Sequence, residues 1–250
     1  MKKKNIYYYE TIQRVDASKL FFFRLFLSLS SWPRVLIEVF TRRGFGERYF
    51  SFSLCLFLAA NLAALPFALP TYGSSFFGVI WGNITWYIYL VLFLIASFKR
   101  YLEVKHEPGV FDFAKFSLSP GIVIPQVREF RVFGRKLTTR TIATVIEPGL
   151  FGILGLILVS FEQKIGFVLL ACSSIYSLSW RIQYYLGTHF IMDKIDEMIC
   201  NEELVNTFVD KQLPEETRGF EVYGDAPRNS EFRRKVVENM FEDEPAVDVL

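Results

Sequence analysis

The hydrophobic pattern of the chain is dominated by four long runs that carry almost no charge. The runs cover residues 50–69, 76–98, 141–160 and 164–187, and the first two contain no Asp, Glu, Lys or Arg. At about 1.5 Å per residue, roughly 20 helical residues cross a hydrocarbon core about 30 Å thick. The pattern therefore predicts four transmembrane helices.

The runs are joined in pairs by short turns, at residues 70–75 and 161–163, and neither turn is long enough to hold a domain. We therefore expect an all-α integral membrane protein in which residues 50–98 form one transmembrane hairpin and residues 141–187 form another. The other expected segments are an N-terminal cytoplasmic and interfacial segment (1–49), a basic loop (99–140), a cytoplasmic helix (188–213) and an acidic, flexible tail (214–250).

Residues 17–43 mix large apolar side chains with Lys19, Arg24 and Arg34, a pattern typical of an amphipathic helix that lies in the membrane interface. Pro33 is expected to break or kink this helix. Two interpretations follow from the same pattern: a surface anchor that senses or recruits something, or a helix that covers the inner face of the bundle.

Charge along the chain predicts the orientation. Residues 1–49 carry ten basic and four acidic side chains, residues 99–140 carry nine and four, and the turn at 70–75 carries none. Short loops rich in Lys and Arg stay on the cytoplasmic side, so both termini and the 99–140 loop are expected there, in a plasma (inner) membrane. Residues 188–250 carry seven basic and sixteen acidic side chains, so the overall charge of +2 conceals three strongly charged blocks.

Composition agrees with this class, because 52% of the residues are hydrophobic, 27 are Phe and the mean hydropathy is +0.27. This exceeds what a soluble domain needs to fill one core. Cys55 and Cys172 fall inside predicted spans and Cys200 falls in a cytoplasmic segment, where disulfides are not expected.

Two opposite charges inside the second hairpin define the main candidate site. Glu147 and Arg181 lie at matching depths on neighbouring antiparallel helices, so we expect them to form an intramembrane ion pair. Pro148 and Gly149 weaken the adjacent helical hydrogen bonding and could leave carbonyls open to a ligand, as in transporters. The alternative is a structural ion pair that fixes the register of the hairpin.

Two surfaces are expected on the cytoplasmic side. One is a basic surface suited to anionic headgroups, and the other is an apolar stripe at near-helical spacing that is suited to a protein partner. The basic surface comprises Arg42, Arg43, Arg48, Arg131, Arg135, Lys136 and Arg140. The docking stripe comprises Ile191, Ile195, Met198, Val205 and Phe208.

Enzyme signatures such as G-x-x-x-x-G-K-[ST], H-E-x-x-H and G-x-S-x-G are absent from the sequence, so no catalytic residue and no cofactor are expected. His189, Asp193 and Asp196 share a helix face, but without Cys or a second His nearby they are not expected to bind a metal. The basic residues flank the spans, where topology explains them, and nucleic-acid binding is not expected.

Two functions remain open at this point. The first is a non-enzymatic membrane scaffold or assembly subunit of a secretion, conjugation or envelope complex, which presents cytoplasmic interaction surfaces. The second is an oligomeric transporter or channel subunit for a small solute or ion, with its polar site at Glu147 and Arg181. Four helices enclose little volume, so the second function requires self-association, and a homo-oligomer or membrane complex is expected in either case.

Overall fold

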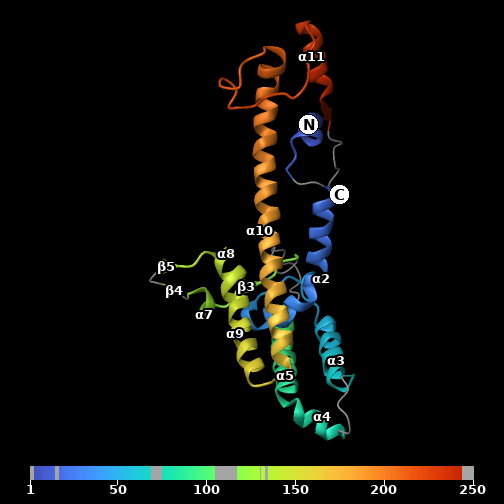
Figure 1. The fold of residues 1–250 in the computed structure, drawn as a ribbon, viewed down its shortest axis with the longest axis vertical. Helices are drawn as coiled ribbons and strands as arrows, with labels where there is room; N and C mark the ends of the chain where they lie inside the picture. The colour runs from blue at the N-terminus through green and yellow to red at the C-terminus, as the bar shows by residue number, and fades with distance from the viewer. Residues whose placement is uncertain are drawn as a thin grey trace. The chain divides into compact units, whose positions relative to one another are not determined.

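The computed structural model describes residues 3–14, 17–68, 75–104, 117–129, 131–132 and 135–243 (Figure 1). The chain is mostly helical, at 75%. Three of its helices are long and apolar enough to cross a membrane, and the number rises to four if one bent helix pair counts as a span. The expected helical membrane architecture is therefore confirmed at this level.

The chain divides into two compact units, which are described separately. The terminal unit contains residues 1–23 and 184–250, and the central unit contains residues 24–183. The elements that begin in the terminal unit are β1 (Lys3–Asn5), α1 (Ile6–Thr11), α2 (Ala17–Thr41), η2 (Val205–Val209), α11 (Ser230–Asn239) and β6 (Phe241–Asp243). The remaining elements are β2 (Arg42–Arg43), α3 (Phe52–Ala68), α4 (Phe76–Gly82), α5 (Ile84–Val104), β3 (Ile122–Val123), α7 (Pro125–Arg128), β4 (Arg131–Val132), β5 (Arg135–Lys136), α8 (Thr139–Thr141), η1 (Ile142–Ile146), α9 (Glu147–Ser160) and α10 (Ile165–Leu204).

The candidate spans differ in part from the four hydrophobic runs. Thr139–Ser160 and the continuous helical stretch Ile165–Val209 are long and apolar enough to cross a membrane, and so is α2, which was expected to lie in the interface. In contrast, α3 is apolar but has only 17 residues, and most of the turn that follows it lies outside the described residues. Pro33 lies inside α2 and does not end it.

The second run is bent, because α4 and α5 meet at 78° around Asn83. The Asn83 side chain donates a hydrogen bond to the carbonyl of Val79, which competes with continuous helical hydrogen bonding at this point. At its other end, α5 continues beyond the 76–98 run and ends at Val104. Arg100 is buried and donates to the carbonyl of Val39, so its charge does not end the helix.

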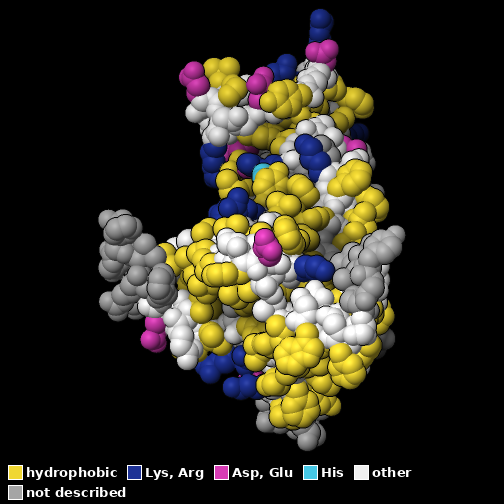
Figure 2. Space-filling model, turned by 60° about the horizontal axis from the view of Figure 1, so that its bottom comes forward, with side chains coloured by type: hydrophobic (Ala, Val, Ile, Leu, Met, Phe, Trp, Pro, Cys, Tyr) yellow, Lys and Arg dark blue, Asp and Glu magenta, His cyan; other side chains and the backbone are white. Residues whose placement is uncertain are grey.

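The core of the central unit lies among α5 and α10, with α2, α3 and α9 packed against them. Its buried members are Trp86, Tyr89, Leu90, Ile165 and Leu169. Large apolar side chains on α3, α5, α9 and α10 remain exposed, and hydrophobic side chains spread over much of the face shown in Figure 2. A monomeric soluble protein rarely exposes so much apolar surface, whereas lipid solvates it.

Two prolines inside these helices free carbonyls that neighbouring helices then satisfy. Pro66 has no N–H for the carbonyl of Leu62, and the indole of Trp86 donates to that carbonyl at 2.8 Å. Pro148 similarly leaves the carbonyl of Thr144 without its α-helical donor. Proline is tolerated in membrane helices where neighbours supply such donors.

Glycines allow α9 and α10 to pack backbone to backbone. A Cβ on Gly166 would lie 2.6 Å from the carbonyl oxygen of Gly155, and one on Gly155 would lie 3.0 Å from that of Gly166. Gly152 approaches Ser173, but a Cβ on Gly149 would meet nothing within 4 Å. The Gly-rich third run thus supplies close helix contacts through two of its three glycines.

Two short strand pairs lie in the central unit. β2 pairs with β3, with Arg42 opposite Val123 and Arg43 opposite Ile122, and β4 pairs with β5. Gly121 has a φ of +75°, and a Cβ there would lie 2.7 Å from the carbonyl oxygen of Arg43, so glycine is needed for this approach.

In the terminal unit, the ends of the chain come together. β1 pairs with β6 in an antiparallel register, and a cluster of Leu204, Phe208, Val209 and Val237 forms the core. Residues 214–250, expected to be a flexible tail, include α11, which packs against η2 in this core. Residues 244–250 lie outside the described residues.

Candidate functional site

Three charged side chains gather at the junction of α2 and β2. Arg34 and Glu38 on α2 and Arg42, the first residue of β2, recur every four residues, the spacing at which side chains on an α-helix become neighbours. All three are buried, and Glu38 is 0% exposed. Buried charges are expensive unless they are paired and hydrogen-bonded, so their partners decide the nature of the site.

The first pair is formed within α2 and completed by a tyrosine. Arg34 donates to Glu38 Oε1 from Nε at 3.1 Å and from Nη2 at 2.9 Å. The Tyr49 hydroxyl accepts from Arg34 and donates to Glu38 Oε2. Tyr49 thus connects both charges of the pair.

The second pair joins the start of β2 to α9. Arg42 donates from Nε to Glu147 Oε1 at 2.9 Å and from Nη2 to Glu147 Oε2, which is a two-point guanidinium–carboxylate contact. The Tyr176 hydroxyl on α10 donates to Glu147 Oε2 at 3.0 Å. Glu147 is 0% exposed, so its charge is compensated entirely inside the protein.

Trp180 brings the two pairs together. The guanidinium of Arg42 lies 4.3 Å and that of Arg34 lies 4.8 Å from the centre of the indole ring, both within cation–π range. We call Arg34, Glu38, Arg42, Tyr49, Glu147, Tyr176 and Trp180 the buried charge cluster. Its two guanidinium groups and two carboxylates give no net charge, which suits a site inside a membrane protein.

The backbone around Glu147 departs from an α-helix, because η1 is a π-helical turn that ends immediately before it. Ser177 donates to the carbonyl of Thr144 at 2.6 Å, and Ser173 donates to the carbonyl of Pro148 at 2.6 Å. Pro148 and Gly149 were expected to leave carbonyls open to a ligand. The carbonyls of Thr144 and Pro148 are instead occupied by serine hydroxyls of α10.

Arg181 does not meet Glu147, in contrast to the expected ion pair. The Arg181 side chain is exposed and lines a separate hollow of about 360 Å³ together with Pro148 and Gly149. The antiparallel geometry was expected to pair the two charges, but Arg42 approaches Glu147 from a different element and takes both carboxylate oxygens.

The expected basic surface needs one correction. Arg42 is buried in the charge cluster because the two residues of β2 alternate, with Arg42 facing inward and Arg43 outward. Arg43, Arg48 and Arg140 are exposed, as expected for a surface. The side chains of Arg131, Arg135 and Lys136 lie outside the described residues.

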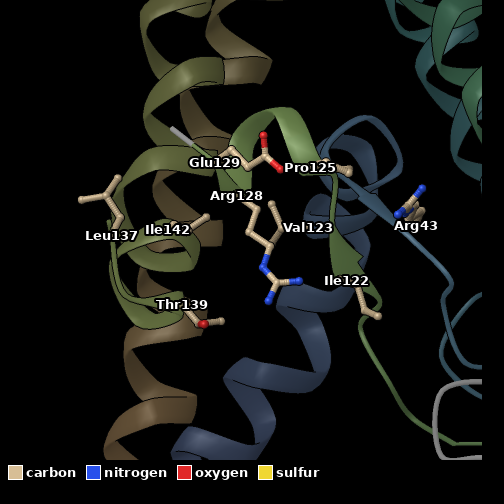
Figure 3. Close-up of a pocket in the computed structure, with 9 residues that line it drawn as sticks. All are labelled: Arg43, Ile122, Val123, Pro125, Arg128, Glu129, Leu137, Thr139 and Ile142. Carbon is tan, nitrogen blue, oxygen red and sulfur yellow. The ribbon is translucent and has the colours of Figure 1, made fainter. Parts of the chain in front are cut away.

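A cavity of the central unit lies beside β2 and β3 (Figure 3). It has a volume of about 690 Å³ and combines an apolar wall with charged and hydroxyl groups. Its lining residues are Arg43, Ile122, Val123, Pro125, Arg128, Glu129, Leu137, Thr139 and Ile142.

Four of the five docking-stripe residues on α10 and η2 are exposed, with Ile191 at 60% and Met198 at 63%. Phe208 differs, because it is 6% exposed and packs in the core of the terminal unit against α11. The docking stripe as the structure has it therefore consists of Ile191, Ile195, Met198 and Val205.

The opposite face of α10 is covered by the N-terminal segment. Tyr8 donates to Asp193 at 3.0 Å, Arg14 pairs with Asp196, and Asn5 donates to Asn201 at 2.7 Å. At 3.6 residues per turn, Asp193 and Asp196 lie about half a turn around the helix from the docking stripe. Chain residues 5–14 thus occupy one face of α10 and leave the docking stripe exposed.

These contacts give a structural role to Asp193 and Asp196, the two aspartates that share a helix face with His189. Asp193 accepts hydrogen bonds from Tyr8 and from the backbone N–H of Arg14, and Asp196 is paired with Arg14. Within the described part of the chain, His, Cys, Asp and Glu form no group that could hold a metal ion. Burial, followed by the hydrogen bond to Asp193, raises the pKa of Tyr8, and the hydrogen bond to Asp196 raises the pKa of Arg14.

Comparisons with known proteins give no family for the chain, since no family model, no curated protein and no solved structure matches it.

Proposed function

We propose that the protein is a non-enzymatic membrane scaffold or assembly subunit. In this proposal it crosses the plasma (inner) membrane four times as two hairpins, α3 with α4–α5 and α8–α9 with α10. Both termini and the segment between α5 and α8 lie in the cytoplasm, where the docking stripe binds a protein partner. The observation that carries the proposal is that the buried charges neutralise one another while the docking stripe is exposed.

Contacts inside the terminal unit support an even number of crossings. β1 pairs with β6, and Asn5 bonds to Asn201, so the segments before α2 and after α10 share one compartment. Two segments on the same side of a bilayer are separated by an even number of crossings. If α2 crossed in addition to the four hydrophobic runs, the number would be five, which is incompatible with this pairing.

The same reasoning supports an interfacial α2, although α2 is long enough to cross. Arg42–Arg43 pair with Ile122–Val123, and the N–H of Gly46 donates to the carbonyl of Ser119 at 2.9 Å, so α2 ends on the side of the segment that leads to α8. α9 and α10 are joined by a tight turn and cross as a pair, which returns the chain to that side before Asp193. α2 then begins and ends on one side, as an interfacial helix does.

The orientation rests on the charge asymmetry of the sequence. This topology places residues 1–49, 99–140 and 188–250 on one side, and these segments carry 26 basic side chains, whereas the turns on the other side, 70–75 and 161–163, carry no Lys or Arg. Acidic side chains, which are numerous in residues 188–250, contribute little to orientation. Positive loops resist translocation, so this side is the cytoplasm.

The chemistry of the docking stripe suggests its partner. Ile191, Ile195 and Met198 follow the spacing of an apolar helix seam, and residues 188–250 carry sixteen acidic against seven basic side chains. A complementary partner is a cytoplasmic protein with an apolar helix face rimmed by Lys and Arg.

The topology is tested by labelling single cysteines in a variant whose three native cysteines are replaced by alanine. Cysteines replace Ser18, Arg48, Glu162 or Thr188, all exposed, and a membrane-impermeant maleimide is applied to sealed vesicles of each orientation. Positions 18, 48 and 188 should react from the cytoplasmic side and position 162 from the other. Reaction of positions 18 and 48 from opposite sides would overturn the placement of α2.

The scaffold role is tested by purifying the protein with its partners from native membranes. Ile195→Gln with Met198→Gln should remove a stoichiometric cytoplasmic partner while the protein stays in the membrane. Phe190→Gln with Met192→Gln, two equally exposed apolar positions of α10 outside the docking stripe, is the matched control and should retain it. Equal retention by both variants, or recovery of only a second copy of this chain, contradicts the proposed partner.

One observation favours a second candidate, an oligomeric transporter or channel subunit. The hollow beside Pro148 and Gly149 is lined by Arg181 and by hydroxyl groups of Thr144 and Ser174, among others. If this is the solute site, Arg181→Gln should abolish flux in reconstituted vesicles at unchanged protein abundance, and the docking-stripe variant should transport normally. If the scaffold proposal is correct, Arg181→Gln changes neither partner recovery nor vesicle permeability.

A further inference from the structure

The cavity beside β2 and β3 has two chemically distinct walls. Ile122, Val123, Leu137 and Ile142 form an apolar wall, and Arg43, Arg128, Glu129 and Thr139 add charged and hydroxyl groups. Its volume of about 690 Å³ is in the range of small-molecule sites and is far larger than a single ion requires.

Strand alternation and register place Arg43 at the wall of this cavity. In β2, Arg42 turns inward to Glu147, so Arg43 turns outward, and pairing with Ile122 holds it at the cavity wall. The close approach at Gly121 fixes this pairing, because a side chain there would collide with the Arg43 carbonyl. The position of Arg43 is thus determined by the backbone.

Arg128 reaches the same cavity from the other side. It ends the single turn of α7, which begins at Pro125, and Figure 3 shows its side chain extending into the space between Thr139 and Ile122. Glu129, the next residue, lines the cavity as well.

Arg43 and Arg128 differ from those arginines of the central unit that form ion pairs. Arg34 and Arg42 are paired in the buried charge cluster, and Arg100 is paired with Glu103. Arg43 and Arg128 are exposed, and neither guanidinium group makes an ion pair or hydrogen bond with any residue that the structure describes. Two guanidinium groups that line one cavity and have no carboxylate partner suit the binding of an anion.

We propose that this cavity binds the headgroup of an anionic glycerophospholipid, with Arg43 and Arg128 on the phosphodiester and Glu129 accepting a hydrogen bond from a headgroup hydroxyl. The apolar wall accommodates the glycerol and the first methylenes of an acyl chain. Basic pockets between transmembrane helices on the cytoplasmic side bind such lipids in general.

A lipid suits the cavity better than free phosphate does, because the apolar residues in the wall have no role toward a bare anion. Residues 128–140 also carry five basic side chains and one acidic side chain, which attract an anionic membrane surface. The inference rests on the proposed membrane placement, but it requires neither the docking stripe nor its partner.

The test measures phosphatidylglycerol binding to the purified full-length protein in detergent, by native mass spectrometry, with phosphatidylcholine as the zwitterionic comparison. Arg43→Gln with Arg128→Gln should lower the affinity for phosphatidylglycerol roughly 30-fold, given the usual contribution of two basic residues. Arg24→Gln with Arg48→Gln removes the same charge at exposed positions that do not line the cavity. This control should change the affinity for phosphatidylglycerol less than about threefold.

A second variant keeps all charges and fills the space. Ile122→Trp should lower phosphatidylglycerol binding at least about tenfold if the cavity, and not the surrounding field, holds the lipid. Inorganic phosphate and glycerol 3-phosphate should displace the lipid only at far higher concentrations.

Equal losses in the two arginine double variants, no effect of Ile122→Trp, or displacement by inorganic phosphate at lipid-like concentrations would each overturn the proposal. Cysteine labelling reports the topology independently, so failure here is distinguishable from failure of the membrane placement.

Discussion

Arg42 and Glu147, which lie 105 residues apart in the sequence, form a two-point ion pair in which the carboxylate is completely buried. This contact fixes the end of α2 and the start of β2 to α9. Because Trp180 contacts both Arg42 and Arg34, and Tyr176 contacts Glu147, one network reaches α2, β2, α9 and α10. The geometry supports a structural role for the charges.

Glu147→Gln should therefore destabilise the protein. The substitution keeps the shape but leaves the Arg42 guanidinium buried without its counter-charge, and breaking a buried pair in this way costs about 3–5 kcal/mol. We expect a large fall in the apparent melting temperature in detergent, measured by size-exclusion chromatography after heating.

The control for this experiment is Arg181→Gln. Arg181 is exposed and does not contact Glu147, so its loss should leave the melting temperature almost unchanged. Arg42→Leu combined with Glu147→Leu removes both charges together and should recover much of the stability, because the desolvation penalty disappears as well. A melting temperature of Glu147→Gln equal to that of the unmodified protein would show that the pair is not structural.

The sequence allowed the helices to be predicted because lipid solvation depends on composition, which is local information. Long uncharged runs predicted most of the helical segments from α3 to α10, whereas α11 lies in a segment that was expected to be a flexible tail. The bend at Asn83 was not predicted, since a single Asn in an apolar run is compatible with a straight helix. Whether α2 crosses the membrane or lies in its interface depends on which strands pair, and hydropathy alone cannot decide between the two.

The candidate site was predicted only in part, because pairing between distant segments leaves little trace in a single sequence. Glu147 was singled out as a charge at membrane depth, but its partner was expected at Arg181, on the neighbouring helix. The signal that could have indicated the true cluster is the spacing of Arg34, Glu38 and Arg42, which predicts one helix face with alternating charges. Assigning Arg42 to the basic surface overlooked this spacing.

Packing of α9 on α10 yields a second prediction. Gly166→Ala should destabilise the hairpin by about 1–3 kcal/mol, because the new Cβ would lie 2.6 Å from the Gly155 carbonyl oxygen and the helices must separate. Gly149→Ala is the matched control in the same hairpin, where a Cβ meets nothing, and it should be neutral or stabilising by up to about 1 kcal/mol. Thermal stability in detergent measures both, and a similar loss for the two variants would show that close helix approach is unimportant.

A third prediction concerns Arg233 on α11, which is buried and donates two hydrogen bonds to the carbonyl of Val209 and one each to those of Pro227 and Arg228. Arg233→Met should release α11 from the end of η2, since the buried carbonyls lose a charged donor, at a cost of about 2 kcal/mol or more. Limited proteolysis should then cleave residues 214–239 faster. Arg234→Met, at the exposed neighbouring position, should not change the cleavage rate.

The last prediction is a pH dependence of the attachment between the N-terminal segment and α10. Tyr8 is buried, donates to Asp193, and also faces the carboxylates of Asp196 and Glu197, so the pKa of its hydroxyl is raised. A group whose pKa is higher in the folded state stabilises that state fully below its unfolded pKa of about 10, and the stabilisation is lost as the pH rises above that value. The attachment should therefore weaken progressively above pH 10.

A nitroxide on a cysteine at Gln13 in the cysteine-free variant reports this attachment by its mobility. The label should be immobile from pH 8 to about pH 10 and become mobile at higher pH. Tyr8→Phe removes both the titrating hydroxyl and its bond to Asp193, so the label should be more mobile at pH 8 but should lose most of the change above pH 10. The ion pair of Arg14 with Asp196 remains in both proteins and keeps part of the attachment. An unchanged alkaline transition in Tyr8→Phe would show that another group, and not the Tyr8 hydroxyl, is responsible for it.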